Sequence, residues 1–137
     1  MAKAVPLGTR AEVEQRVAFE HTLARFSSKL PPVLSTPDMI GLMEWACYVA
    51  AEPYSEDDEI TVGTAINVEH LAATGIGAPV KAEAVLEKVE GKFYIYRVRA
   101  WDERQEIGRG TVTRAFVSVS RFMKRIEPKP APEAASP

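Results

Sequence analysis

The stretch TPDMIGLMEWACYVAAEP, residues 36–53, decides the fold because it is the one segment of the chain that predicts a stable helix. Thr36 is a good N-cap, Pro37 suits the first helical position, and Asp38 suits the positive end of the helix dipole. Pro53 ends the segment, since proline cannot continue a helix. We therefore predict one helix across this stretch.

The predicted helix runs from Asp38 to about Glu52, and its body is apolar nearly all round. Such a helix is expected to be surrounded by protein rather than to lie on a surface. Glu44 is the only acid in its middle. A carboxylate there either points along a narrow wet stripe or is functional, because ionised groups are almost never buried without a partner. The helix has little other polar surface, so we favour Glu44 as a general base.

The rest of the chain predicts strands. Ala11 to Leu23 alternates apolar and polar residues, which is typical of a half-buried strand. Glu90-Gly91 predicts a tight hairpin, and residues 102–105 a turn. Four further strands are expected: Ile60 to Leu71, Val80 to Val89, Phe93 to Trp101, and Gly110 to Val119. In the first of these, one face is expected to carry Ile60, Val62, Ile66, Val68 and His70.

One strand, a buried helix and an antiparallel meander predict an α+β domain with a curved antiparallel sheet of about five strands around one central helix. That arrangement is the hot-dog architecture. A single helix leaves an edge and part of one face of the sheet uncovered, so a homodimer is expected. We assign residues 1–10 to a lead-in, 11–126 to the domain and 127–137, rich in Pro and Ala, to a disordered tail.

Composition narrows the possible functions. The chain has 137 residues, 46% of them hydrophobic, and a net charge of −2, which is typical of one soluble domain and argues against nucleic-acid binding. No stretch predicts a membrane span or a leader. The single cysteine, Cys47, excludes an intrachain disulfide and favours a reducing cytoplasm. Two distant histidines do not suggest a metal site, and no dinucleotide or Walker motif predicts a cofactor.

The segment before the helix predicts a cover over a pocket or an interface. Pro31 and Pro32 exclude a regular helix or a central strand, yet their neighbours Leu30, Val33 and Leu34 are apolar. An apolar loop usually covers something. We therefore interpret Leu30 to Leu34 as a flap.

Three further residues have both a structural and a functional interpretation. His70 ends a strand on the predicted inner face, where a histidine is more often a core residue than a catalyst, but a buried Glu44 would need such a partner. Thr36 is explained by capping, although a hydroxyl there also lies where N–H groups could stabilise an oxyanion, and Ser35 could serve either role. Gly63, inside a strand, indicates a bulge or a close approach of substrate.

Over most of its length the chain resembles the fluoroacetyl-CoA thioesterase-like family of hot-dog proteins. The segments that carry the resemblance are GLMEWAC (41–47), VGTAI (62–66), HLAAT (70–74), and EIGRGT (106–111) with the following Arg114. The resemblance implies that Thr36, Glu44 and His70 are catalytic. It also implies that Gly63 and the adjacent Thr64 hold the acyl group, with Leu30 and Val33 of the flap and Arg114 near the site. The fluoroacetyl-specific member has phenylalanine just before the threonine, whereas this chain has residues 30–34 there, so fluoroacyl selectivity is not predicted.

Thr36 and Glu44 present a geometric conflict, because eight residues of helix separate them. That separation is about 12 Å along a continuous helix. Either the helix begins later than predicted, or the site combines two subunits, and we favour a composite site at a dimer interface. The predicted function is hydrolysis of a short-chain acyl-CoA to free acid and coenzyme A, without a cofactor. The alternatives are a non-catalytic acyl-CoA-binding module and an enoyl-CoA hydratase or dehydratase.

Overall fold

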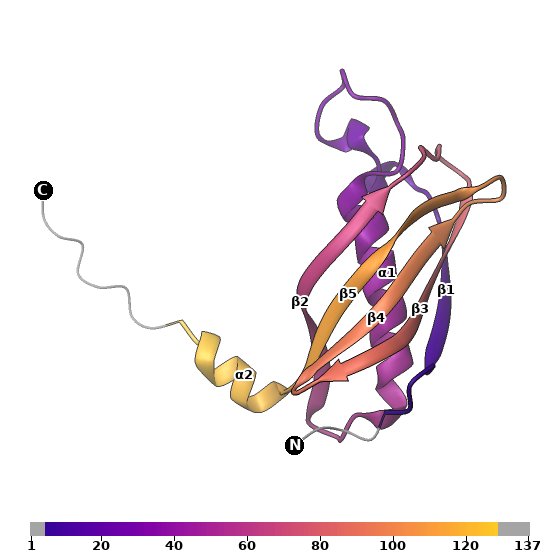
Figure 1. Ribbon diagram of the computed structural model, residues 1–137. Coiled ribbons are helices and arrows are strands. Elements are labelled where there is room, and N and C mark those ends of the chain that lie inside the picture. The colour runs from indigo at the N-terminus through magenta and orange to yellow at the C-terminus, as the bar shows by residue number, and fades with distance from the viewer. Residues whose placement is uncertain (1–4, 129–137) are drawn as a thin grey trace, which may run out of the picture.

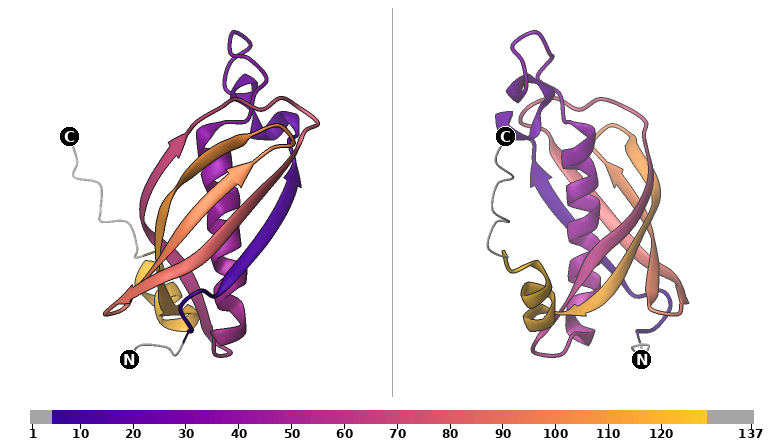
Figure 2. Two further views of the ribbon diagram at one scale, coloured as in Figure 1. Left: turned by 45° about the vertical axis from the view of Figure 1, so that its right-hand side comes forward. Right: turned by 90° about the vertical axis from the view of Figure 1, so that its left-hand side faces the viewer.

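Five antiparallel strands form one sheet, in the order β1-β3-β4-β5-β2, that curls around a long helix (Figures 1 and 2). The computed structural model describes residues 5–128. The strands are β1 (Arg10–Arg16), β2 (Glu59–His70), β3 (Pro79–Glu90), β4 (Phe93–Trp101) and β5 (Glu106–Ser118), and the helices are α1 (Thr36–Ala51) and α2 (Val119–Ile126). Short 3-10 turns are η1 (Phe19–His21), η2 (Leu23–Arg25) and η3 (Glu52–Tyr54). The predicted hot-dog architecture is confirmed.

Helix α1 lies close against the inner face of the sheet because small residues line that face. Ala82, Ala84 and Ala100 on β3 and β4 are fully buried. A Cβ at Gly108 would collide with the Met39 side chain of α1. The side chains that α1 buries are Met39, Leu42, Met43, Ala46, Cys47, Ala50 and Ala51. Contact on this scale, rather than helix propensity, stabilises α1.

The other side of α1 is open, which corrects the prediction that protein surrounds the helix. Trp45 is 54% exposed and stacks on Tyr48, with their ring centroids 5.1 Å apart. Gly41 is also exposed. From its apolar composition the helix was predicted to be covered on all sides, but its own chain covers only the side that faces the sheet.

The start of α1 differs from the sequence prediction by one residue. Ser35, not Thr36, is the N-cap, and its Oγ accepts a hydrogen bond from the Asp38 N–H at 3.1 Å. Thr36 is the first residue of the helix, so its hydroxyl is not used as a cap. Both residue types cap well, and only the structure distinguishes them.

β1 ends at Arg16, whereas the alternation predicted a strand as far as Leu23. After β1 the chain leaves the sheet through η1 and η2. The Nδ1 atom of His21 accepts a hydrogen bond from the Ala18 N–H at 2.9 Å, which stabilises the turn. His21 therefore has a structural role.

A β-bulge in β2 lies between Gly63 and Ala65, where the pairing register with β5 shifts. Before the bulge, Thr61 and Gly63 face α1. After it, Val68 packs on the core and His70 faces the start of α1. The bulge thus moves the inner face from odd to even residue numbers. The alternation predicted one continuous face, which is right after the bulge and wrong before it.

The end of the chain differs most from the prediction. β5 begins at Glu106 rather than Gly110, and helix α2 follows it, although no helix was predicted there. The proposed tail lies mostly outside the described residues. No helix among residues 5–128 is both long enough and apolar enough to span a membrane.

Gly110 should be essential to the pairing of β2 with β5. A Cβ there would meet the Cα of Val68 at 2.7 Å and the carbonyl carbon of Asn67 at 2.9 Å. These are backbone atoms, which cannot move aside without a large cost in free energy. We expect Gly110→Ala to lower the free energy of unfolding by about 2–4 kcal/mol, measured by urea denaturation.

Gly41→Ala is the matched control for that change. A Cβ at Gly41 meets nothing within 4 Å, and the residue lies inside α1. Replacing it should raise stability by about 0.5–1 kcal/mol, because alanine favours the helix. Equal effects of the two substitutions would contradict the close-approach argument.

Candidate functional site

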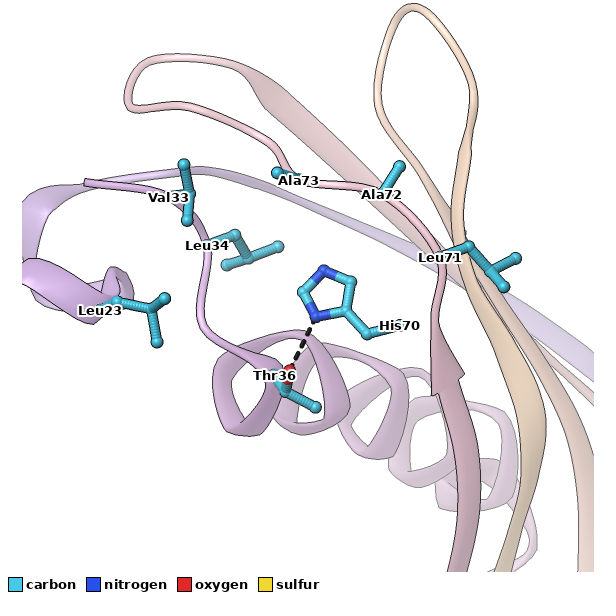
Figure 3. Close-up of a pocket in the computed structure, with 8 residues that line it drawn as sticks. All are labelled: Leu23, Val33, Leu34, Thr36, His70, Leu71, Ala72 and Ala73. Atoms are coloured by element: carbon cyan, nitrogen blue, oxygen red, sulfur yellow. Dashed lines mark hydrogen bonds between the residues drawn. The ribbon is translucent and has the colours of Figure 1, made fainter. Parts of the chain in front are cut away.

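Thr36 and His70 meet at the wall of an open cavity of about 370 Å³ (Figure 3). The Thr36 Oγ1 and the His70 Nδ1 are 2.8 Å apart, which is the distance of a good hydrogen bond. Thr36 is placed by the first turn of α1, and His70 by the last residue of β2. The remaining lining is Leu23, Val33, Leu34, Leu71, Ala72 and Ala73.

The flap forms one wall of this cavity, as predicted. The Leu34 N–H donates to the Thr74 carbonyl at 2.8 Å, and Val33 pairs with Gly75, so the flap is tied to the loop that follows His70. Leu30 does not line the cavity and is 40% exposed. Of the two flap residues, Val33 lines the cavity and Leu30 does not.

His70 is poised to be neutral at physiological pH. Burial lowers its pKa below the ordinary value of 6.5. The interaction with the Ala72 backbone raises the pKa, but by less than burial lowers it. Its buried Nε2 points toward the Ala72–Ala73 segment, where no described group forms a hydrogen bond of good geometry with it (Figure 3). A neutral imidazole beside a hydroxyl is an arrangement that can accept a proton from it.

The start of α1 offers fewer oxyanion donors than an ordinary helix N-terminus. Pro37 has no N–H, and the Asp38 N–H is already bonded to Ser35. Among the described residues the Thr36 N–H has no partner, so one donor remains. The Asp38 carboxylate also lies in this turn, where it interacts with Arg25 at 3.3 Å. An oxyanion at this position needs donors from elsewhere.

Glu44 lies apart from this pair, in contact with Arg114. The Arg114 guanidinium donates to Glu44 Oε2 at 3.1 Å, and its other nitrogens donate to Thr61 Oγ1 at 3.2 Å and to the Thr61 carbonyl at 2.7 Å. The Arg114 side chain is 8% exposed, while that of Glu44 is 34% exposed. Glu44 therefore neutralises a buried cation and still reaches solvent.

Gly63 is small because Glu44 passes directly over it. A Cβ at Gly63 would collide with Glu44 Oε2, and Arg114 Nη1 lies 3.5 Å from the same point. Gly63 thus lies beside the bulge and is also closely approached by another group. That group is the carboxylate of Glu44 in the same chain, not a substrate. The neighbouring Thr64 points to β5, where its hydroxyl donates to the Thr113 carbonyl at 3.3 Å.

The predicted residues therefore fall into two groups within one chain. Thr36, His70 and Val33 share the cavity, while Glu44, Gly63 and Arg114 form a second cluster farther back along α1 and β2. Sequence reasoning missed Thr61, which anchors Arg114, because a threonine in a strand carries no signal of its own. It also missed the small Ala72 and Ala73, although they lie in the HLAAT segment.

Other reactive groups in the chain are poor candidates. Burial raises the pKa of the Cys47 thiol to about 12, so this cysteine is an inert core thiol. Among residues 5–128, no group of three or more His, Cys, Asp or Glu side chains could hold a metal ion.

Comparison with known proteins identifies the family. A sequence profile of the fluoroacetyl-CoA-specific thioesterase family matches residues 17–120. The fluoroacetyl-CoA thioesterase of Streptantibioticus cattleyicolor is 44% identical over 102 residues, which are 74% of this chain and 73% of that protein.

Solved structures agree with the sequence comparisons. A structure of the fluoroacetyl-CoA thioesterase FlK superposes with a TM-score of 0.84 at 38% identity, covering 91% of this chain and 98% of the other. A hypothetical protein of Thermus thermophilus, described as a thioesterase superfamily member, superposes with a TM-score of 0.81 at 30% identity, covering 90% and 92%. The chain therefore belongs to the fluoroacetyl-CoA-specific thioesterase family, whose members hydrolyse acyl-CoA thioesters.

Proposed function

We propose that this protein hydrolyses a short-chain acyl-CoA to the free acid and coenzyme A, with its reaction centred on Thr36 and His70. The observation that carries the proposal is the 2.8 Å contact between Thr36 Oγ1 and His70 Nδ1 at the wall of an open cavity. The thioesterase relatives support the reaction class. The apolar lining residues Leu23, Val33 and Leu34 suit a short acyl group.

In the proposed reaction, His70 is the general base. Its neutral Nδ1 accepts the proton of the attacking oxygen, which is the Thr36 hydroxyl or a water bound to it. A C–O bond forms at the thioester carbonyl, the C–S bond breaks, and the coenzyme A thiolate takes the proton from the imidazolium. When Thr36 is the nucleophile, water then hydrolyses the acyl-threonine. The lowered pKa of His70 suits this role, because the imidazole stays unprotonated at neutral pH.

Glu44 enters this proposal through a second copy of the chain. β2 lies at an edge of the sheet, and antiparallel pairing of two β2 strands would bring the Glu59 end of one against the His70 end of the other. Gly63 and His70 are seven positions apart in β2, or about 23 Å. A two-fold axis at Asn67 would pair Ile66 with the partner's Val68. Because Gly63 and Thr64 share one pairing position at the bulge, the same axis would set the partner's Gly63 opposite His70.

That register would complete the site. The partner's Glu44, which overlies the partner's Gly63, would stand beside Thr36 and His70 and could orient the attacking water. The backbone of the partner's Gly63 could add an oxyanion donor, which the start of α1 lacks. The eight-residue gap between Thr36 and Glu44 then has a physical explanation.

The Thr36 hydroxyl should be required for turnover. We expect Thr36→Val, which keeps the shape and removes the hydroxyl, to lower kcat/KM for acetyl-CoA by about 10²-fold or more, measured as free-thiol release. Thr36→Ser keeps the hydroxyl and should retain most of the activity. If the Val variant were as active as the wild type, the hydroxyl would have no part in the chemistry.

The pH profile should report the lowered pKa of His70. Since burial disfavours the imidazolium, the acid limb of kcat/KM is expected to have its midpoint below pH 6.5, with activity rising as pH increases through it. His70→Ala should remove both the activity and this limb. A midpoint clearly above 6.5 would contradict His70 as the base. Because the folded state binds fewer protons than the unfolded chain here, stability should also fall as pH drops below 6.5.

Glu44 needs a test that separates chemistry from charge balance. Glu44→Gln should lower thiol release by about 10²-fold or more, but it also leaves Arg114 as an unpaired buried cation. The double variant Glu44→Gln with Arg114→Met removes both charges and should recover the melting temperature. We expect it to remain inactive.

Recovery of turnover in the double variant would show that Glu44 acts only by neutralising Arg114. Glu87→Gln, an exposed carboxylate on β3, is the control for a general effect of charge and should behave as wild type.

A further inference from the structure

Helix α2 is strongly amphipathic, yet none of its residues is buried. Its apolar residues follow the spacing of one helix face: Val119, Phe122, Met123 and Ile126. Phe122, Met123 and Ile126 are 36%, 54% and 56% exposed. The basic residues Arg121, Lys124 and Arg125 fall on the opposite face. A stable helix with an uncovered apolar face needs a partner.

The start of α2 is held in place rather than hanging from the end of β5. The Asp58 carboxylate accepts hydrogen bonds from the Ser118 hydroxyl at 2.7 Å and the Ser120 hydroxyl at 2.6 Å. The Val119 N–H donates to the Asp58 carbonyl at 2.7 Å. These bonds lower the pKa of Asp58, led by the one from Ser120. Residue 58 directly precedes β2, so the helix is fixed at the start of that strand.

The position of α2 relative to the sheet suggests what covers it. The helix extends past the free edge of β2, on the same side of the sheet as α1 (Figures 1 and 2). The Thr36–His70 cavity lies at the far end of β2. That strand has 12 residues, or about 40 Å. The apolar face of α2 therefore cannot reach the cavity of its own chain.

The two edges of the sheet differ in a way that favours self-pairing at β2. Residues 60–68, ITVGTAINV, carry no charge, and within the described structure β2 pairs with β5 alone. The opposite edge, β1, has the sequence RAEVEQR, in which four of seven residues are charged. Charged edges resist pairing with another strand, and uncharged ones permit it.

Antiparallel pairing of β2 with β2 would bring the start of one strand to the end of the other. The start carries α2, and just beyond the end lie Leu71 and Ile76, which are 42% and 52% exposed. Leu71 also lines the Thr36–His70 cavity. Two exposed apolar surfaces, far apart in one chain, would thus meet in a pair of chains.

We propose that α2 packs its apolar face on the Leu71–Ile76 segment of a second copy and so closes one side of that copy's Thr36–His70 cavity. Each cavity then has a wall from the other protomer. The catalytic consequence rests on the proposed function, whereas the packing does not. The basic face remains in solvent at the mouth of the cavity, where it favours the approach of an anionic substrate such as an acyl-CoA.

A second copy fits this surface better than a lipid membrane. Eight residues with four apolar side chains bury little area in a bilayer. The segment EDDE, residues 56–59, carries four carboxylates, and its Asp58 is bonded to the start of α2. This negative charge weakens the attraction of the helix to anionic lipid.

Disulfide cross-linking tests the packing without reference to activity. Phe122→Cys and Met123→Cys are each combined with Ile76→Cys. A disulfide requires Cα atoms within about 7 Å, so these pairs can join only two copies. We expect mild oxidation to give a covalent dimer, seen on a non-reducing gel, with at least one of the two pairs. Arg125→Cys with Ile76→Cys is the matched control from the opposite helix face, and it should react at least tenfold more slowly.

No covalent dimer from either pair, or equal rates for the pairs and the control, would overturn the proposal. Binding of the wild type to phosphatidylserine vesicles that is lost in Phe122→Asp, without cross-linking, would assign the helix to membranes instead.

Subunit mixing tests the catalytic consequence. His70→Ala and Phe122→Asp chains, each of low activity alone, are co-expressed with different tags and the mixed dimer is purified. In that dimer one site combines an intact His70 with the intact α2 of the other chain. We expect thiol release to return to about half the wild-type rate per dimer.

If α2 served its own site, the mixed dimer would stay inactive, and the proposal would fail. Activity in His70→Ala alone would contradict the proposed function, while the cross-linking result would still decide the packing.

Discussion

The close contact between α1 and the small-residue face of the sheet is the constraint on which the rest of the structure depends. Alanines on β3 and β4, and Gly108 beneath Met39, let the helix axis come near the strands. Once the helix is fixed there, Thr36 and Glu44 are held at two separate places along its length. The distance between them is set by helix geometry, and no adjustment of side chains can remove it.

The second cluster is governed by electrostatics rather than by packing. Arg114 is a buried cation, and four hydrogen bonds to Thr61 and Glu44 compensate for its lost hydration. Glu44 is the exposed member of the pair, so it can face a neighbouring molecule while it balances Arg114. A carboxylate that is held firmly and remains accessible is suited to orient a water molecule.

The sequence predicted the elements that long patterns define and missed those that single contacts decide. The helix, the antiparallel sheet of five strands and the β4 boundaries were confirmed, because each rests on many residues. The N-cap was misplaced because Ser35 and Thr36 are equally good caps. The first strand was predicted to be too long because apolar and polar residues keep alternating after β1 ends. In that segment the chain turns instead, and a hydrogen bond from the Ala18 N–H to His21 Nδ1 stabilises the turn. α2 was missed because eight residues give a weak pattern.

For the site, sequence and resemblance identified residues that the structure brings into two clusters. One cluster contains Thr36 and His70, and the other contains Glu44, Gly63 and Arg114. They could not predict that Glu44 contacts Arg114, since that contact depends on the register of β2 against β5. The assignment of Thr36, Glu44 and His70 to one reaction stays a prediction.

The bulge in β2 limits which insertions and deletions the strand can accept in evolution. Because it switches the inward-facing residues from odd to even positions, Gly63 and His70 can both face the helix although they are seven positions apart, an odd offset. A single-residue insertion or deletion between them would turn His70 to the outer face of the sheet. Loops elsewhere can vary in length, but between Gly63 and His70 this strand can accept only changes that keep both side chains on the inner face. The number of residues between these two positions should therefore be constant among active relatives.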